Sequence, residues 1–240
     1  MHIGISGPIA SGKSTLAKSL QSVFELMDIR ARITPFAEDL KWMASLYGSP
    51  ELIPQLLQAF RILNYDEVTV WKGVAKTLEA FLLYPPVDGV KPRKLYQFIG
   101  AEMGRNTVDP ELWIKAVQRR IRADKTHLYF ISDDVRFYNE IQALDYHVHI
   151  SIPDNAMTLY EMRKSLFPPD HFFSDHESEQ EILPAADYTI PINYTVDQLI
   201  HLAKSINHFQ RKNVILTQRD LPDAFSQAAV AMANFGKSFK

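Results

Sequence analysis

The sequence predicts an α/β fold with a parallel sheet, covered by helices and interrupted by a large helical insert. Short apolar runs alternate with helical patterns, a glycine-rich loop directly follows the first apolar run, and a long helical block separates the second run from the third. Strands that alternate with helices are typical of a parallel sheet buried on both faces.

The expected strands are short apolar runs bounded by turn residues. The first, at 3–6, leads into the glycine-rich loop, and the second, at 29–34, ends before a proline. Three more are expected at 128–131, 148–152 and 187–190. This number of strands is sufficient for a central sheet.

The helices are expected where apolar residues recur at helical spacing. The first begins at Lys13, immediately after the glycine-rich loop. Asp109 and Pro110 open another, because Asp favours the N-cap and Pro the first helical position. Further helical patterns cover 37–48, 51–63, 66–83, 92–104, 135–144, 156–165 and 195–208.

The 240 residues are enough for one large domain. We expect a main domain over 1–206, with the helical insert at about 37–125 and a lid at about 157–182. The tail at 207–240 contains an amphipathic pattern at 224–235. This segment would dock on the domain or pack on another subunit, and the sequence leaves both open.

Composition excludes several classes of function. A net charge of −2 gives no reason to expect duplex nucleic acid as a partner. The absence of cysteine excludes disulfides, thiolate metal sites and cysteine nucleophiles. The N-terminus lacks the pattern of a signal peptide, and the longest apolar run, at 80–84, is too short to span a bilayer. We therefore expect a cytoplasmic protein with no membrane partner.

Residues 7–14 read GPIASGKS and match the pattern G-x-x-x-x-G-K-[ST] at every fixed position. Glycines let backbone N–H groups turn toward a nucleotide phosphate, and the following helix presents its N-terminus to the anion. The pattern predicts a P-loop NTPase-type three-layer sandwich that binds ATP and Mg²⁺. The expected nucleotide contacts are Gly7, Ala10, Ser11, Gly12, Lys13, Ser14 and Thr15, with Ser14 also at the metal.

The phosphate loop does not by itself name the reaction. The guanine-binding pattern Asn-Lys-x-Asp of GTPase switches is absent, and the balanced charge does not favour a helicase or motor. A small-molecule kinase needs three further features: a carboxylate near Mg²⁺, a binding site for the acceptor phosphate, and a lid that carries cations.

Candidates exist for all three features. Asp133 and Asp134 follow an expected strand, and either could serve as the metal-side acid. Arg136 lies two residues further on and offers a forked donor for an acceptor phosphate. Arg163 lies in the lid candidate at 161–170.

The expected helix at 92–104 presents an amide and leads to a guanidinium. Gln97, Ala101 and Arg105 are four residues apart and share one face if the segment is α-helical. That face would suit the base and the phosphate of one nucleotide. A polar outer face with no ligand is the alternative.

Six stretches together resemble the phage deoxynucleoside monophosphate kinase family. Order and spacing are also similar, and the resemblance extends over about residues 1–205. The stretches are GPIASGKST at 7–15, FAEDLK at 36–41, LYQFIGAEMGR at 95–105 followed by Trp113, ISDDVRFYNE at 131–140, DHESE at 175–179 and ADYTIPINYTVDQL at 186–199.

The resemblance implies transfer of the ATP γ-phosphoryl group to a deoxynucleoside monophosphate, in the supply of DNA precursors within the host cytoplasm. It implies catalytic roles for Lys13, Asp134 and Arg136, with Asp134 at the metal or on the acceptor side. Apart from the resemblance, we expect Arg163 of the lid candidate to act in catalysis by closing over the phosphates. A homodimer is left open. The implied acceptor-binding residues are Lys41, Gln97, Glu102, Arg105, Trp113, Arg136, Glu140, His176, Ser178 and Glu179.

The resemblance has two limits. The loop reads Gly-Lys-Ser where several family members have Gly-Lys-Asp, which keeps a metal-binding hydroxyl at Ser14. The segment 45–90 matches nothing in the family, so base selectivity is not predicted. Two other functions remain: a different small-molecule kinase, such as a dephospho-coenzyme A kinase-like enzyme, and a nucleotide-binding regulatory protein without transfer activity.

Overall fold

The computed structural model describes residues 1–166 and 185–213. The chain divides into two compact units. The first contains Met1–Thr34 together with the described residues from Asp124 onward, and the second is Pro35–Ala123.

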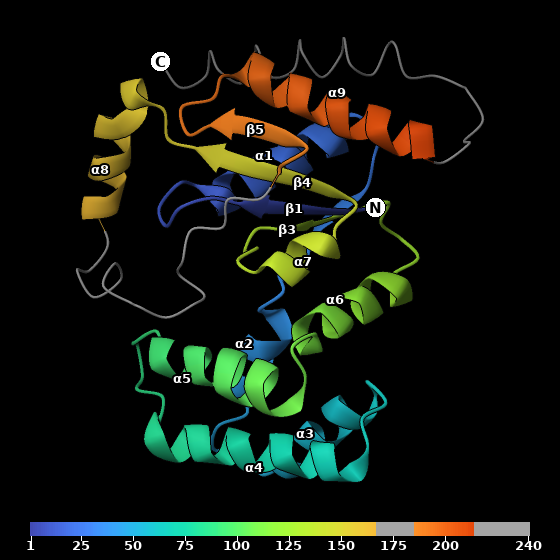
Figure 1. Cartoon of the computed structure of the whole chain (residues 1–240), viewed down its shortest axis with the longest axis vertical. Helices are drawn as coiled ribbons and strands as arrows, with labels where there is room; N and C mark the ends of the chain where they lie inside the picture. Colours follow the sequence, from blue (N-terminus) through green and yellow to red (C-terminus); the bar gives the residue numbers. More distant parts are fainter. Residues whose placement is uncertain (167–184, 214–240) are drawn as a thin grey trace. The chain divides into compact units, whose positions relative to one another are not determined.

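The first unit is built on a five-stranded, all-parallel sheet with the order β2-β3-β1-β4-β5 (Figure 1). The register places Gly4 of β1 beside Ser132 of β3, and Ser6 beside His149 of β4. The predicted α/β class with a parallel sheet is therefore confirmed. The strands are β1 (His2–Ser6), β2 (Ala31–Ile33), β3 (Tyr129–Ser132), β4 (Tyr146–Ser151) and β5 (Tyr188–Pro191).

Helices of the first unit lie on both faces of this sheet. Figure 1 shows α1 and α9 over one face and α7 on the other. Alternate strand residues such as Ile3 and Ile5 are fully buried in the same core as Leu20 and Phe24 of α1, and this burial holds the helix on the sheet. The helices are α1 (Lys13–Leu26), α7 (Tyr138–Gln142), the 3₁₀ turn η2 (Asp154–Ala156), α8 (Met157–Ser165) and α9 (Val196–Asn213).

The opposite face of the sheet carries buried polar side chains. His2 Nε2 lies 2.8 Å from Ser132 Oγ, which donates a hydrogen bond to the Thr34 carbonyl at 2.7 Å. Ser6 Oγ lies 2.7 Å from His147 Nε2. Buried polar groups destabilise a fold unless they are paired, so these contacts allow a polar layer beneath the strands.

The second unit is helical and has an apolar core of its own. Phe60 of α3 and Val74 of α4 are buried in this core, together with Met103 of η1. Residue Gly73 allows close packing, because a Cβ there would lie 2.7 Å from the Phe60 ring. The helices are α2 (Glu38–Ser45), α3 (Leu52–Arg61), α4 (Glu67–Leu83), α5 (Arg93–Gln97), the π-helix η1 (Phe98–Val108) and α6 (Leu112–Ala123).

The segment after α5 corrects the prediction of one regular helix at 92–104. It is helical, but η1 is a π-helix of 11 residues with wider i→i+5 bonding. At its end, Thr107 Oγ1 donates to the Glu102 carbonyl at 2.6 Å and Asp109 N donates to the Gly104 carbonyl at 2.8 Å. The wider bonding changes which residues share a face, so the α-helical face assumed for Gln97 and Arg105 is wrong.

Within the described ranges, no helix combines the length and the apolar character needed to cross a membrane.

Candidate functional site

The glycine-rich loop joins the end of β1 to the start of α1. It contains three residues with positive φ: Gly7 at 142°, Ala10 at 65° and Gly12 at 89°. Gly12 is the N-cap of α1 and adopts the left-handed conformation that glycine accepts without strain. The loop therefore turns back on itself between the strand and the helix, as the motif predicts.

The Lys13 side chain closes this loop. Its ammonium group donates hydrogen bonds to the carbonyls of Gly7 and Pro8, each at 2.8 Å. The lysine is only partly buried. A cation held at the centre of a loop is placed to meet an incoming anion.

Three observations indicate that the loop fits a phosphate chain. A Cβ at Gly7 would lie 2.9 Å from the Ile150 carbonyl, so only glycine leaves the loop its present path. Ser11 Oγ is buried and has no hydrogen-bond partner among the described residues. The first intrahelical bond of α1 is Leu16 N to Gly12 O, so the N–H groups of Ser14 and Thr15 precede it and form the anion-attracting end of the helix.

Arg163 of α8 reaches the same loop. Its Nη1 atom lies 3.0 Å from the position that a Cβ on Gly12 would occupy. Both residues belong to the first unit, so this contact does not depend on the placement of the helical unit. The Arg163 guanidinium therefore lies beside the glycine-rich loop, and its role as a lid cation stays a prediction.

The two aspartates follow β3 at the same end of the sheet. The recorded pairing of β1 with β3 ends at Gly4 and Ser132, and the two aspartates directly follow it along the chain. Asp133 and Asp134 are both partly exposed. Among the described residues, no three His, Cys, Asp or Glu side chains cluster as a metal site would require. A metal here would therefore rely on one carboxylate, Ser14 and nucleotide oxygens.

Glu140 has a role that the sequence did not indicate. It is 3% exposed, and its Oε2 atom accepts hydrogen bonds from the backbone N–H of Arg136 at 2.8 Å and of Phe137 at 3.1 Å. A buried carboxylate at the start of α7 thus fixes the backbone from which the Arg136 side chain extends. Glu140 acts here by positioning Arg136.

Five predicted acceptor-binding residues lie in the helical unit. Lys41 and Glu102 are exposed, and Gln97 and Arg105 are partly exposed. Arg105 Nη1 donates to the Pro110 carbonyl at 3.2 Å, and Glu102 Oε2 accepts from Asn106 Nδ2 at 3.2 Å.

Trp113, the fifth of these residues, is 3% exposed and donates from Nε1 to the Gly100 carbonyl at 2.8 Å. Its ring lies 2.7 Å from the position of a Cβ at Gly104, so the indole packs directly over η1. His176, Ser178 and Glu179 lie outside the described residues, as does most of the lid at 157–182 and the amphipathic pattern at 224–235.

A histidine pair at the base of the loop was not found from the sequence. Ser6 Oγ lies 2.7 Å from His147 Nε2 and 2.9 Å from His149 Nδ1. Burial lowers the pKa of His147 below its ordinary value. Ser6 has one proton to donate, so at least one histidine must donate to it, and the three side chains are coupled. The parallel register, which no sequence pattern shows, creates this contact.

Comparison with known proteins gives one informative similarity. No family model matches the chain. Over 124 residues the chain is 28% identical to the deoxynucleoside-5'-monophosphate kinase of Escherichia phage T5, an alignment that covers 50% of the chain. The chain spans less than half of that relative, because the alignment covers 43% of it. The crystal structure of TT1252 from Thermus thermophilus is 17% identical with a TM-score of 0.45, covering 87% of this chain and 96% of that one.

Proposed function

We propose that this chain is a nucleotide kinase that transfers the γ-phosphoryl group of ATP to a deoxynucleoside monophosphate. The observation that carries the proposal is the phosphate loop after β1, with Lys13 at its centre and the Arg163 guanidinium at its rim. The similarity to a phage protein named as such a kinase supports the choice of acceptor.

The loop would bind the triphosphate through its own backbone. The N–H groups at the start of α1 and the Lys13 ammonium both belong to the loop and the first turn of the helix, so negative charge is favoured there. Ser14 and either Asp133 or Asp134 would hold Mg²⁺, and a bound Mg²⁺ neutralises charge on the phosphate oxygens. The ordering of these groups before binding would reduce the reorganisation that transfer requires.

The acceptor would be held by cations separate from the loop. Arg136 is the candidate in the first unit, because the buried Glu140 fixes its backbone. Lys41 and Arg105 are the candidates in the helical unit. A cationic group on the acceptor phosphate would orient its oxygen toward the γ-phosphorus and reduce repulsion between the two anions.

Transfer needs no covalent enzyme intermediate. A monophosphate oxygen is already ionised near neutral pH, so no strong general base is required. The transition state spreads negative charge over the transferred oxygens, and Lys13 and Arg163 would stabilise that charge. With Arg163 over the loop, water would be kept from the γ-phosphate, which limits wasteful hydrolysis.

A coupled ADP-release assay tests the proposal. The four common deoxynucleoside monophosphates, their ribose counterparts and dephospho-coenzyme A are each offered with ATP and Mg²⁺. We expect ADP release that depends on a deoxynucleoside monophosphate. ADP release that depends only on dephospho-coenzyme A would show that this compound, and not a deoxynucleoside monophosphate, is the acceptor. ATP binding without ADP release on any acceptor would indicate a regulatory protein.

A further inference from the structure

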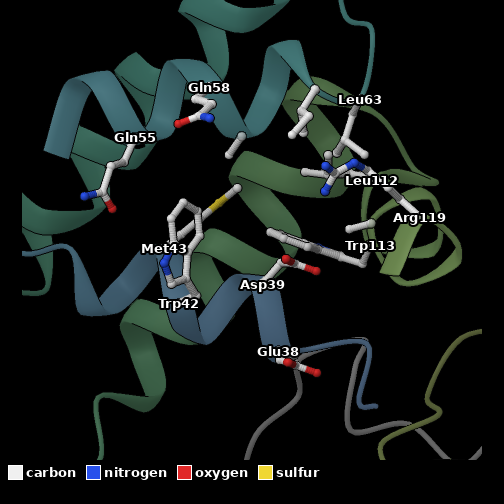
Figure 2. A pocket seen from close by; sticks show the side chains of 13 residues that line it. Glu38, Asp39, Trp42, Met43, Gln55, Gln58, Leu63, Leu112, Trp113 and Arg119 are labelled. Carbon is white, nitrogen blue, oxygen red and sulfur yellow. The ribbon is translucent and has the colours of Figure 1, made fainter. Parts of the chain in front are cut away.

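The helical unit encloses a cavity of about 370 Å³ between α2, α3 and α6 (Figure 2). Trp42 and Trp113 supply flat aromatic surfaces, and Met43, Ile62 and Leu63 contribute apolar contacts. Trp42 is 40% exposed, which leaves part of its indole available to a ligand. A volume of this size is within the range of small-molecule sites and would hold a nucleobase with part of its sugar.

One wall of the cavity carries the Asp39 carboxylate. Its Oδ2 atom is buried and forms an ion pair with Arg120 Nη1 at 3.3 Å, while the side chain as a whole is 31% exposed. The same Arg120 nitrogen lies 2.8 Å from Glu38 Oε2, so one cation serves two acids. Burial raises the pKa of Asp39 above the ordinary carboxyl range, against the opposing effect of Arg120. The exposed part of the carboxylate can accept a hydrogen bond from a ligand N–H group.

The other wall offers neutral amides. Gln55 and Gln58 of α3 line the cavity, and no side-chain hydrogen bond from either is recorded among the described residues. Figure 2 shows Gln58 on the α3 side and the Asp39 carboxylate beside the Trp113 ring, both facing the space between the helices. An amide both donates and accepts, so this wall suits the mixed polar edge of a heteroaromatic ring.

We propose that this cavity binds an amino-bearing nucleobase, with Asp39 accepting from the amino group and Trp42 stacking on the ring. The base would belong either to the acceptor nucleotide or to a free nucleoside that binds as an effector. Only the first source rests on the proposed kinase function. Aromatic stacking is tolerant of base identity, so discrimination between bases falls to Asp39.

Cytosine and uracil separate these contributions, because they differ in the group at ring position 4, an amine in one and a carbonyl in the other. Calorimetric titration of the full chain with deoxycytidine and deoxyuridine measures binding without any transfer. We expect deoxycytidine to bind about tenfold or more tightly, since a carbonyl facing the carboxylate leaves both acceptors unsatisfied. Asp39→Asn should reduce this preference to near unity, because an amide can donate to the uracil carbonyl.

Two further variants distinguish recognition from folding. Glu67→Gln is the matched control, because Glu67 also lies in the first turn of a helix in this unit but pairs with Arg61 outside the cavity. It should bind both nucleosides as the unmodified chain does. Trp42→Leu should weaken the binding of both nucleosides by a similar factor and leave the ratio of their affinities unchanged. This variant tests the cavity even if Asp39→Asn fails to fold.

The source of the base is decided by the kcat/KM ratio of dCMP to dUMP. If Asp39→Asn lowers this ratio together with the nucleoside preference, the cavity holds the acceptor base. If only nucleoside binding changes, it is a separate effector site. Absence of saturable binding for both nucleosides, or a preference that Asp39→Asn leaves intact, would overturn the proposal. Absence of transfer to every deoxynucleotide would refute the kinase function but would leave the calorimetric result to decide the cavity.

Discussion

Replacing Lys13 with methionine separates the chemistry of the phosphate loop from its stability. In the structure, the side chain makes two hydrogen bonds, both at 2.8 Å and both to half-buried loop carbonyls. Water can replace such contacts, so their net loss should lower the free energy of unfolding by about 1 kcal/mol. For a chain of this size, that corresponds to a shift in Tm of about 2–4 °C.

The effect on transfer should be much larger. A fixed donor to charge that develops in the transition state is worth about 10²–10³ in kcat. We therefore expect Lys13→Met to lose at least this factor in coupled ADP release with ATP and a deoxynucleoside monophosphate. Lys18→Met, five residues further along α1 and exposed, is the control for loss of a charge on the same helix.

Two results would refute this reasoning. Turnover of Lys13→Met close to that of the unmodified chain would show that the loop does not bind the transferred phosphate. A loss of activity that matches a large drop in Tm would show that the lysine supports the fold instead. An equal loss in Lys18→Met would assign the effect to overall charge.

Three other predictions follow from single contacts. Gly7→Ala should abolish ATP binding and destabilise the fold by about 3 kcal/mol in urea unfolding, because its Cβ would meet a backbone carbonyl at a φ of 142°. Gly48 also has a positive φ, but a Cβ there would have no atom within 4 Å, so Gly48→Ala should lower the free energy of unfolding by only about 1 kcal/mol. Equal destabilisation by Gly7→Ala and Gly48→Ala would contradict the steric argument. Arg136→Ala should raise KM for the acceptor and leave KM for ATP unchanged. A change in KM for ATP alone would show that Arg136 does not bind the acceptor. Hydrogen bonds from the Thr126 hydroxyl and N–H hold the pKa of Asp124 below its ordinary value of 3.8. A depressed carboxyl pKa stabilises the fold above pH 3.8 and loses that contribution as pH falls toward the folded-state pKa. Below pH 4, the urea midpoint of Asp124→Asn should therefore fall less steeply than that of the unmodified chain. The same pH dependence in both proteins would exclude Asp124 as a source of acid destabilisation.

The sequence predicted the parts of the fold that depend on local patterns. The apolar run before Gly7 and the helical spacing after Lys13 are sufficient for a strand, a loop and a helix. Asp66 likewise marks the start of α4, where its side chain accepts from Thr69 N at 3.0 Å. Local backbone preference and side-chain period carry this information, so no long-range contact is needed to infer it.

Other features depend on which distant residues meet. The strand order β2-β3-β1-β4-β5 and the contact of Ser6 with His149 arise from the register of parallel strands, which short apolar runs do not specify. The π-helix also packs against Trp113 at Gly100 and Gly104, and helical propensity does not include such a tertiary contact.

The candidate site divides in the same way. Lys13 was identified from its motif, and Arg163, predicted as a lid cation, has its guanidinium beside Gly12 of the loop. Glu140 was predicted as a substrate contact, and the structure shows in addition that it is buried and accepts hydrogen bonds from backbone N–H groups. Asp39 was part of a recognised stretch and still received no role, because its place on the wall of the cavity and its ion pair with Arg120 are visible only when α6 is placed against α2.

The most direct test follows the phosphorus atom itself. ATP labelled at the γ-phosphate is incubated with the chain, Mg²⁺ and one deoxynucleoside monophosphate, and the products are separated by chromatography. The account predicts label in the deoxynucleoside diphosphate, in an amount equal to the ADP formed, and none with Lys13→Met. Label that appears only as inorganic phosphate, or that stays in ATP with every acceptor offered, would contradict it.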